Sequence, residues 1–206
     1  KYEVPVIDLD LAEDDPKIID VFTRLNRTFY SLSKVEKLAT EYAPSEFMFV
    51  AKLLTNQLSL APESDDPLSK DPNVPGELYD WAKSQNVSNF QKWLLENNIF
   101  SNYEISRKAP LMFTLNLMAT SIGGFFNRND QSEIYLESYK ENFIKKGTLV
   151  KSFEKVAKFL LDLDMDQNSY WFNKANAFSL FSFLHSNSGK LSTINKTKLK
   201  ERLEAF

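Results

Sequence analysis

"APLMFTLNLMATSIGG", residues Ala109–Gly124, is the part of the sequence that does most to define the fold. No charged side chain interrupts it, and apolar residues on every side are typical of a helix buried in a globular core. The two glycines at its end suit a helix C-cap, because glycine adopts a positive φ without steric cost. The stretch therefore predicts a buried helix that Gly123 and Gly124 close.

Helical patterns cover most of the chain on both sides of this stretch. Asp15 before Pro16 suits a helix N-cap, and Ser33 with Glu36 forms a Ser-x-x-Glu capping box. Only "YEVPVIDLD", residues 2–10, alternates like a strand. We therefore predict a mainly α fold, a multi-helix domain with one N-terminal β-strand. Further helices are expected at 16–25, from 34 onward, and at 45–59, 76–85, 88–98, 131–145, 148–163, 171–184 and 196–205.

The stretch "LAPESDDPLSKDPNVPG" separates two groups of predicted helices. Its prolines and acidic residues mark a surface loop. We therefore expect a first region, 1–60, with the strand and the first helices, a Pro-rich loop at 61–76, and a helical domain at 77–206.

The composition excludes several classes of site. The chain has 206 residues, no cysteine and one histidine, so it lacks disulfides and the usual His/Cys zinc ligand sets. The formal net charge of -3 argues against a wholly basic nucleic-acid surface, although a local patch is compatible with it. No apolar run is long enough to span a membrane, and no signal pattern begins the chain. The sequence predicts a cytoplasmic protein without a membrane partner.

Three other candidate features favour structural interpretations. "DLDMDQN" places Asp162, Asp164 and Asp166 as in a calcium loop, but Gln167 replaces the required glycine, so we predict no metal site. His185 has no second histidine or cysteine as a partner and is interpreted as a helix-end or packing residue. The aromatic residues of the late helix are interpreted as core, because basic residues do not interleave them: Phe172, Phe178, Phe181 and Phe183.

Two basic groups leave alternatives open. Arg24, Asn26 and Arg27 follow the first predicted helix and form either a helix cap with solvated arginines or an anion site, because guanidinium groups suit phosphate oxygens. The C-terminal run "KTKLKER" is either a solvated helix face or a DNA contact. Its candidate contact residues are Lys196, Lys198, Lys200 and Arg202.

Several segments together resemble one known family. "VPVIDLD", "VFTRLNRT" and "LSKVEKLATEY" are similar to the Phe-x-x-Leu-Asn and Leu-Ser-x-x-Glu segment of the GmrSD-type restriction endonuclease N-terminal family of ParB-like domains. "SRKAPLMFTLNLMATSIGGFFNRNDQ" and "YWFNKANAFSLFSFL" are similar to later helices of that family. The likeness runs from about Glu3 to Leu184.

The resemblance implies a larger protein with nucleotide-dependent activity. The family's catalytic Asp-Gly-Gln-Gln-Arg motif lies upstream of this segment and does not occur here. An upstream ParB-like region, GTP or ATP with Mg²⁺ bound there, and a His-Asn-His nuclease domain or subunit are the implied partners and cofactors. This chain itself is expected to hold no cofactor.

The matching residues receive roles from the same resemblance. Phe22 and Leu25 match core anchors, while Ser33 and Glu36 match the Leu-Ser-x-x-Glu part. The family's asparagine falls on Asn26, which with Arg24 and Arg27 would form the rim of a nucleotide site. Phe29 stands where the family usually has a glycine, so a tight phosphate loop is not expected there.

We therefore expect the helical portion of a ParB-like restriction-family protein, which supports nucleotide-dependent DNA restriction or defence without a catalytic residue or complete active site of its own. One alternative is a stand-alone helical protein-interaction module without catalysis. The other is a DNA-binding protein that uses its basic C-terminal helix.

Overall fold

The computed structural model describes Asp15, Lys17, Ile18, Val21 and residues 32–60, 71, 73–124 and 130–205. The chain divides into two compact units, Lys1–Lys34 and Val35–Phe206. The predicted N-terminal strand and most of the predicted Pro-rich loop lie outside the described residues. The residues that the structure describes form helices, turns and loops, with no strand among them.

The predicted start of the first helix is confirmed. Asp15 Oδ1 accepts a hydrogen bond from the backbone N–H of Lys17 at 2.9 Å, and the Asp15 carbonyl accepts one from Ile18 at 2.9 Å. The first bond satisfies an N–H group that has no partner within a helix.

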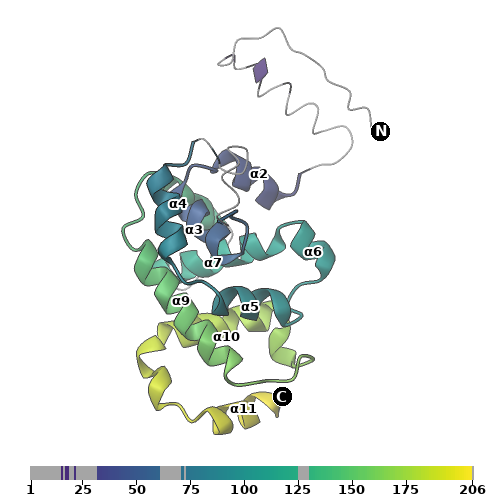
Figure 1. The fold of residues 1–206 in the computed structure, drawn as a ribbon. Coiled ribbons are helices and arrows are strands. Elements are labelled where there is room, and N and C mark those ends of the chain that lie inside the picture. The colour runs from purple at the N-terminus through teal and green to yellow at the C-terminus, as the bar shows by residue number, and fades with distance from the viewer. Residues whose placement is uncertain are drawn as a thin grey trace. The chain divides into compact units, whose positions relative to one another are not determined.

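The described helices follow the predicted order (Figure 1). Two elements, α6 and η3, were not predicted. The elements are α2 (Lys34–Glu41), α3 (Glu46–Leu54), α4 (Gly76–Ser84), α5 (Asn89–Glu96), α6 (Asn102–Ser106), α7 (Ala109–Gly123), α8 (Asp130–Ser138), α9 (Lys146–Leu161), η2 (Tyr170–Phe172), α10 (Lys174–Ser186), η3 (Ser188–Thr193) and α11 (Lys196–Glu204).

Helix α7 is the buried helix that its sequence predicted. Leu111, Leu115 and Met118 are fully buried, and α7 contacts α3, α6, α8 and α10. Gly124 has a φ of 82° at the C-cap, which confirms the predicted helix end. A Cβ added at Gly123 would overlap the hydroxyl of Tyr135 on α8, whereas the ring carbon Cζ of Tyr135 stands 3.4 Å away.

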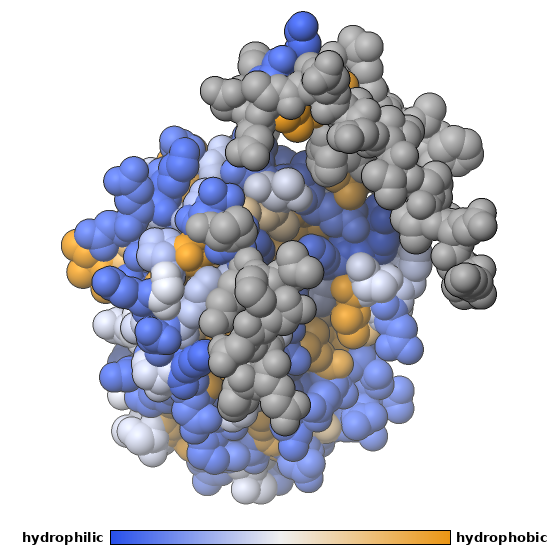
Figure 2. All heavy atoms as spheres, turned by 45° about the horizontal axis from the view of Figure 1, so that its top comes forward, coloured by the Kyte–Doolittle hydropathy of each residue, from blue (hydrophilic) through white to orange (hydrophobic). Residues whose placement is uncertain are grey.

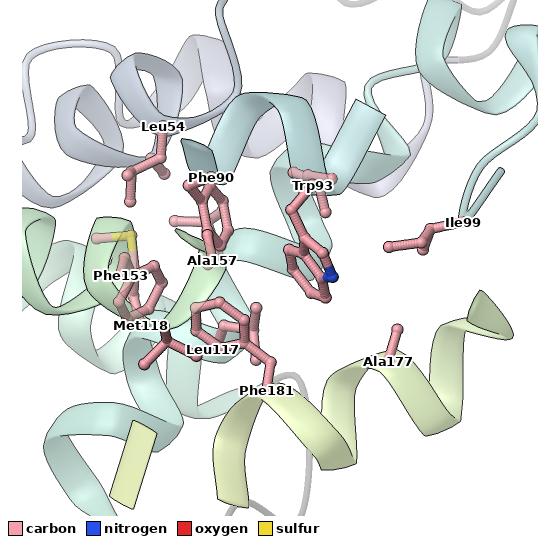
Figure 3. Packing of buried hydrophobic residues seen from close by; sticks show 14 of the residues in the cluster. Leu54, Phe90, Trp93, Ile99, Leu117, Met118, Phe153, Ala157, Ala177 and Phe181 are labelled. Carbon is pink, nitrogen blue, oxygen red and sulfur yellow. The ribbon is translucent and has the colours of Figure 1, made fainter. Parts of the chain in front are cut away.

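Aromatic side chains from α5, α9 and α10 form the centre of the main core (Figure 3). The rings of Trp93 and Phe181 lie 4.8 Å apart, and those of Phe90 and Phe153 lie 5.2 Å apart. A smaller cluster joins α3 to α4 and is made of Phe49, Leu53, Val74, Leu78, Tyr79 and Ala82. Helices from both sides of the predicted loop therefore share one compact unit.

Several predictions about the helices were wrong in detail. The helix expected at 45–59 ends at Leu54, and the helix expected at 171–184 begins at Lys174, after the separate 3-10 turn η2 and the N-cap Asn173. The helix expected at 131–145 ends at Ser138, because the following segment turns to meet α3: the Glu46 carboxylate accepts the Phe143 backbone N–H, and Phe143 is fully buried. Phe183 was predicted as core but is 65% exposed, because it lies on the opposite face of α10 from Phe181.

Candidate nucleic-acid interface

Helix α9 separates its apolar and charged residues onto two faces. Lys151, Lys155 and Lys158 are exposed. They are spaced four and three residues apart, which at 1.5 Å per residue is about 6 Å and about 4.5 Å along the axis. The opposite face enters the core through Leu149, Val150, Phe153, Val156, Ala157, Phe159 and Leu160.

Glu154 is the acidic residue within α9, and it turns away from this lysine row. Its carboxylate accepts the backbone N–H groups of Asn89 at 3.0 Å and Phe90 at 2.9 Å, and that of Ser88 at 3.3 Å. Ser88 is the N-cap residue of α5, but its side chain makes no cap bond, because the Glu154 carboxylate takes that role. The exposed face of α9 therefore carries only positive charge up to the helix end.

The lysine row continues onto α11. Lys155 Nζ donates to the carbonyl of Ser188 at 2.9 Å, which places the start of η3 beside α9. Lys196 at the start of α11 lies over the ring of Phe159 at 5.5 Å. We call the resulting patch the lysine surface: Lys151, Lys155, Lys158 and Lys196.

Asp162 is the carboxylate that interrupts this patch. Its two oxygens accept from Lys196 at 2.8 Å and from Lys158 at 3.4 Å. The hydrogen bond from Lys196 is the main reason that the pKa of Asp162 lies below its ordinary value. One negative charge thus offsets part of the charge of two lysines.

The predicted DNA contacts on α11 divide into three groups. Lys196 belongs to the lysine surface, whereas Lys200 binds the Asp164 carbonyl and lies 3.8 Å from a Glu204 oxygen. Lys198 and Arg202 are exposed on the same helix. The sequence predicted both helices but singled out only the C-terminal one as basic. The lysine row of α9 has a signal of its own, a lysine at every third or fourth position opposite an apolar stripe.

A shallow surface cavity of about 820 Å³, largely open to solvent, lies between α11 and the loop that follows α9. The indole Nε1 of Trp171 donates to the Leu203 carbonyl at 2.8 Å and ties the two sides together. Asp166 uses Oδ1 to accept the Asn168 backbone N–H at 2.7 Å. Within the described residues, no group of three or more His, Cys, Asp or Glu side chains is arranged to hold a metal ion.

His185 has a partner that the sequence did not reveal. Its Nε2 lies 2.9 Å from Ser152 Oγ, and burial lowers its pKa. The Ser152 hydroxyl also donates to the Leu149 carbonyl at 2.8 Å, so its one proton is committed there.

The sequence-predicted nucleotide rim lies outside the described residues. Arg24, Asn26 and Arg27, with Phe22 and Leu25, belong to that part of the chain, so their roles stay predictions. Helix α2 begins at Lys34, directly after Ser33, as predicted. Glu36 lies 3.3 Å from Arg107, which ties α2 to the segment before α7.

The face of the molecule shown in Figure 2 is mixed in character. Hydrophilic residues predominate on the face shown in Figure 2, and hydrophobic ones form separate patches among them. No helix in the described ranges is both long and apolar enough to cross a membrane.

Comparison with family models, with curated proteins and with solved structures found no match to this chain.

Proposed function

We propose that this chain is a DNA-binding helical module whose lysine surface holds the phosphate backbone. The observation that carries the proposal is the segregation of charge on α9: its lysines face outward, while Glu154 is turned inward to cap α5. Binding of this kind is electrostatic and sequence-independent, and it releases counterions from the DNA.

The resemblance to the GmrSD-type family supports a wider form of this proposal. In that wider form, the module contacts DNA within a larger restriction or defence protein. Arg24, Asn26 and Arg27 then form the rim of a nucleotide-binding site that an upstream ParB-like region completes. The support for this wider form is the order of similar segments in the sequence. The DNA-binding proposal stands on the lysine surface and does not depend on it.

The test is fluorescence anisotropy with a labelled random-sequence duplex over a series of salt concentrations. The variant Lys151→Gln/Lys155→Gln/Lys158→Gln removes three phosphate contacts, so the salt slope should fall by about 2.7 and the affinity at low salt by tenfold or more. The matched control, Lys37→Gln/Lys83→Gln/Lys92→Gln, removes the same charge from exposed lysines on α2, α4 and α5. Equal losses in both variants would reduce the effect to net charge and overturn the proposal.

A further inference from the structure

The cavity beside α11 lies one helical turn from the lysine surface. Lys196 belongs to that surface and Lys200 lines the cavity, and the two are four residues apart, about 6 Å along the axis. Asp162, which binds Lys196, is two residues from Asp164, whose carbonyl binds Lys200. A strand whose phosphates follow the lysine surface therefore passes the mouth of the cavity.

Tyr170 provides an exposed aromatic ring on the wall of the cavity. Its side chain is 61% exposed, although its backbone is fixed: its carbonyl accepts from Asn176 Nδ2 at 3.0 Å. The neighbouring Trp171 is held by Leu203, with its ring centroid 6.0 Å from that of Tyr170. An exposed aromatic ring is the kind of platform on which single-stranded nucleic acids stack their bases.

The remaining lining is rich in hydrogen-bond acceptors. Asp164, Asp166 and Glu204 contribute carboxylates, and Gln167 and Asn168 contribute amides. Carboxylates accept from exocyclic amino groups such as N4 of cytosine, and they repel phosphate. The charge distribution therefore favours a base inside the cavity and the backbone outside, on the side of Lys196.

From these features we infer that the cavity binds one unpaired, amino-bearing nucleobase of single-stranded DNA, stacked on Tyr170. Cytosine, adenine and guanine each offer an amino group, whereas thymine offers none, so oligo(dC) is favoured over oligo(dT). The inference rests on the proposed function, because the lysine surface supplies the backbone contacts that bring the base to the cavity.

The experiment measures anisotropy of labelled oligo(dC), oligo(dT) and duplex of equal length with the full chain. Tyr170→Ala should weaken oligo(dC) binding about 5- to 160-fold, which is the range for loss of one stacked base, and leave duplex binding unchanged. Tyr170→Phe keeps the ring and should stay within twofold of the parent chain. Tyr103→Ala is the matched control, because Tyr103 is also exposed, at 74%, and lies on α6.

Different outcomes separate the two proposals. If duplex DNA binds through the lysine surface but Tyr170→Ala leaves the affinity for oligo(dC) unchanged, the base site is overturned and the proposed function stands. Absence of any DNA binding overturns both. Asp166→Asn/Glu204→Gln should bring the oligo(dC) and oligo(dT) affinities closer together, and an unchanged ratio contradicts the role of the carboxylates. A competition titration with dCMP tests whether the strand is needed. The inference predicts that dCMP displaces labelled oligo(dC) much more weakly than unlabelled oligo(dC) does. Equal competition would mean that the cavity binds a free nucleotide instead, and it would contradict the inference.

Discussion

Glu154 and Asn89 are joined by two hydrogen bonds across 65 residues of sequence. Glu154 Oε2 accepts the backbone N–H of Asn89 at 3.0 Å and its side-chain Nδ2 at 2.9 Å. A carboxylate at a helix N-terminus satisfies orphan N–H groups and interacts favourably with the helix dipole. The contact therefore fixes the start of α5 and removes a negative charge from the exposed face of α9.

Replacement of Glu154 should destabilise the fold. We expect Glu154→Ala to lower the free energy of unfolding by about 2 kcal/mol, because several N–H groups lose a charged acceptor. Glu154→Gln keeps one acceptor oxygen and should lose about half as much. Urea unfolding followed by circular dichroism measures both, with Glu201→Ala on the exposed side of α11 as the control. A loss of stability no larger than that of the control would contradict the capping role.

Phe181 and Phe183 offer a matched pair of substitutions on one helix. Phe181 is fully buried against Trp93, whereas Phe183 is 65% exposed. Phe181→Ala should cost about 3–5 kcal/mol of unfolding free energy, because it leaves a cavity among aromatic rings. Phe183→Ala should stay within about 0.5 kcal/mol. Similar losses in both variants, measured by denaturant unfolding, would contradict the orientation of α10.

His185 should make stability depend on pH below neutrality. Burial lowers its pKa in the folded chain, so the unfolded chain binds the proton more readily. Its contribution is complete above the unfolded pKa of about 6.5 and is lost as the pH falls below that value, with a slope of at most about 1.4 kcal/mol per pH unit. Unfolding at pH 7.5, 6.5 and 5.5 measures the effect. His185→Gln should remove most of the change in unfolding free energy between these pH values, because His185 is the single histidine of the chain. An equal pH dependence in that variant would mean that other groups cause it.

Asp162 should limit the affinity of the lysine surface for DNA. Asp162→Asn removes the charge that holds Lys158 and Lys196, so duplex affinity should rise about twofold to fivefold at low salt and the gain should shrink as salt is added. Stability should fall by less than about 1 kcal/mol, because these ion pairs lie at the surface. Anisotropy and urea unfolding of the same preparation separate the two effects. Unchanged affinity would mean that these lysines do not reach the phosphates.

Local sequence rules were sufficient for most helices and their ends. Asp15 shows the predicted N-cap bond, and Gly124 the predicted positive φ. The same rules could have found α6, since Ser101 and Glu104 form a capping box of the kind assigned to Ser33 and Glu36. Its five residues are too few to show an apolar period.

Features that depend on distant contacts were not predictable in this way. Nothing near Glu154 in the sequence shows that it caps α5, so the charge segregation of α9 could be recognised only in three dimensions. The cavity next to Tyr170 likewise needs the docking of α11, which Trp171 and Leu203 fix. Phe183 is different, because its exposure could have been predicted from the sequence. Two residues rotate a helix by about 200°, so Phe181 and Phe183 cannot both face the core.

The contact between Gly123 and Tyr135 constrains the order in which the chain accepts substitutions. The hydroxyl of Tyr135 occupies the space of a Cβ at 123, while the Cζ atom at 3.4 Å leaves room for one. Gly123→Ala is therefore unfavourable in this background and becomes acceptable once Tyr135→Phe has removed the hydroxyl. The combination of Gly123 with Tyr135 can therefore change to alanine at 123 with phenylalanine at 135 if Tyr135→Phe occurs first. Relatives of this chain are expected to vary at the two positions together.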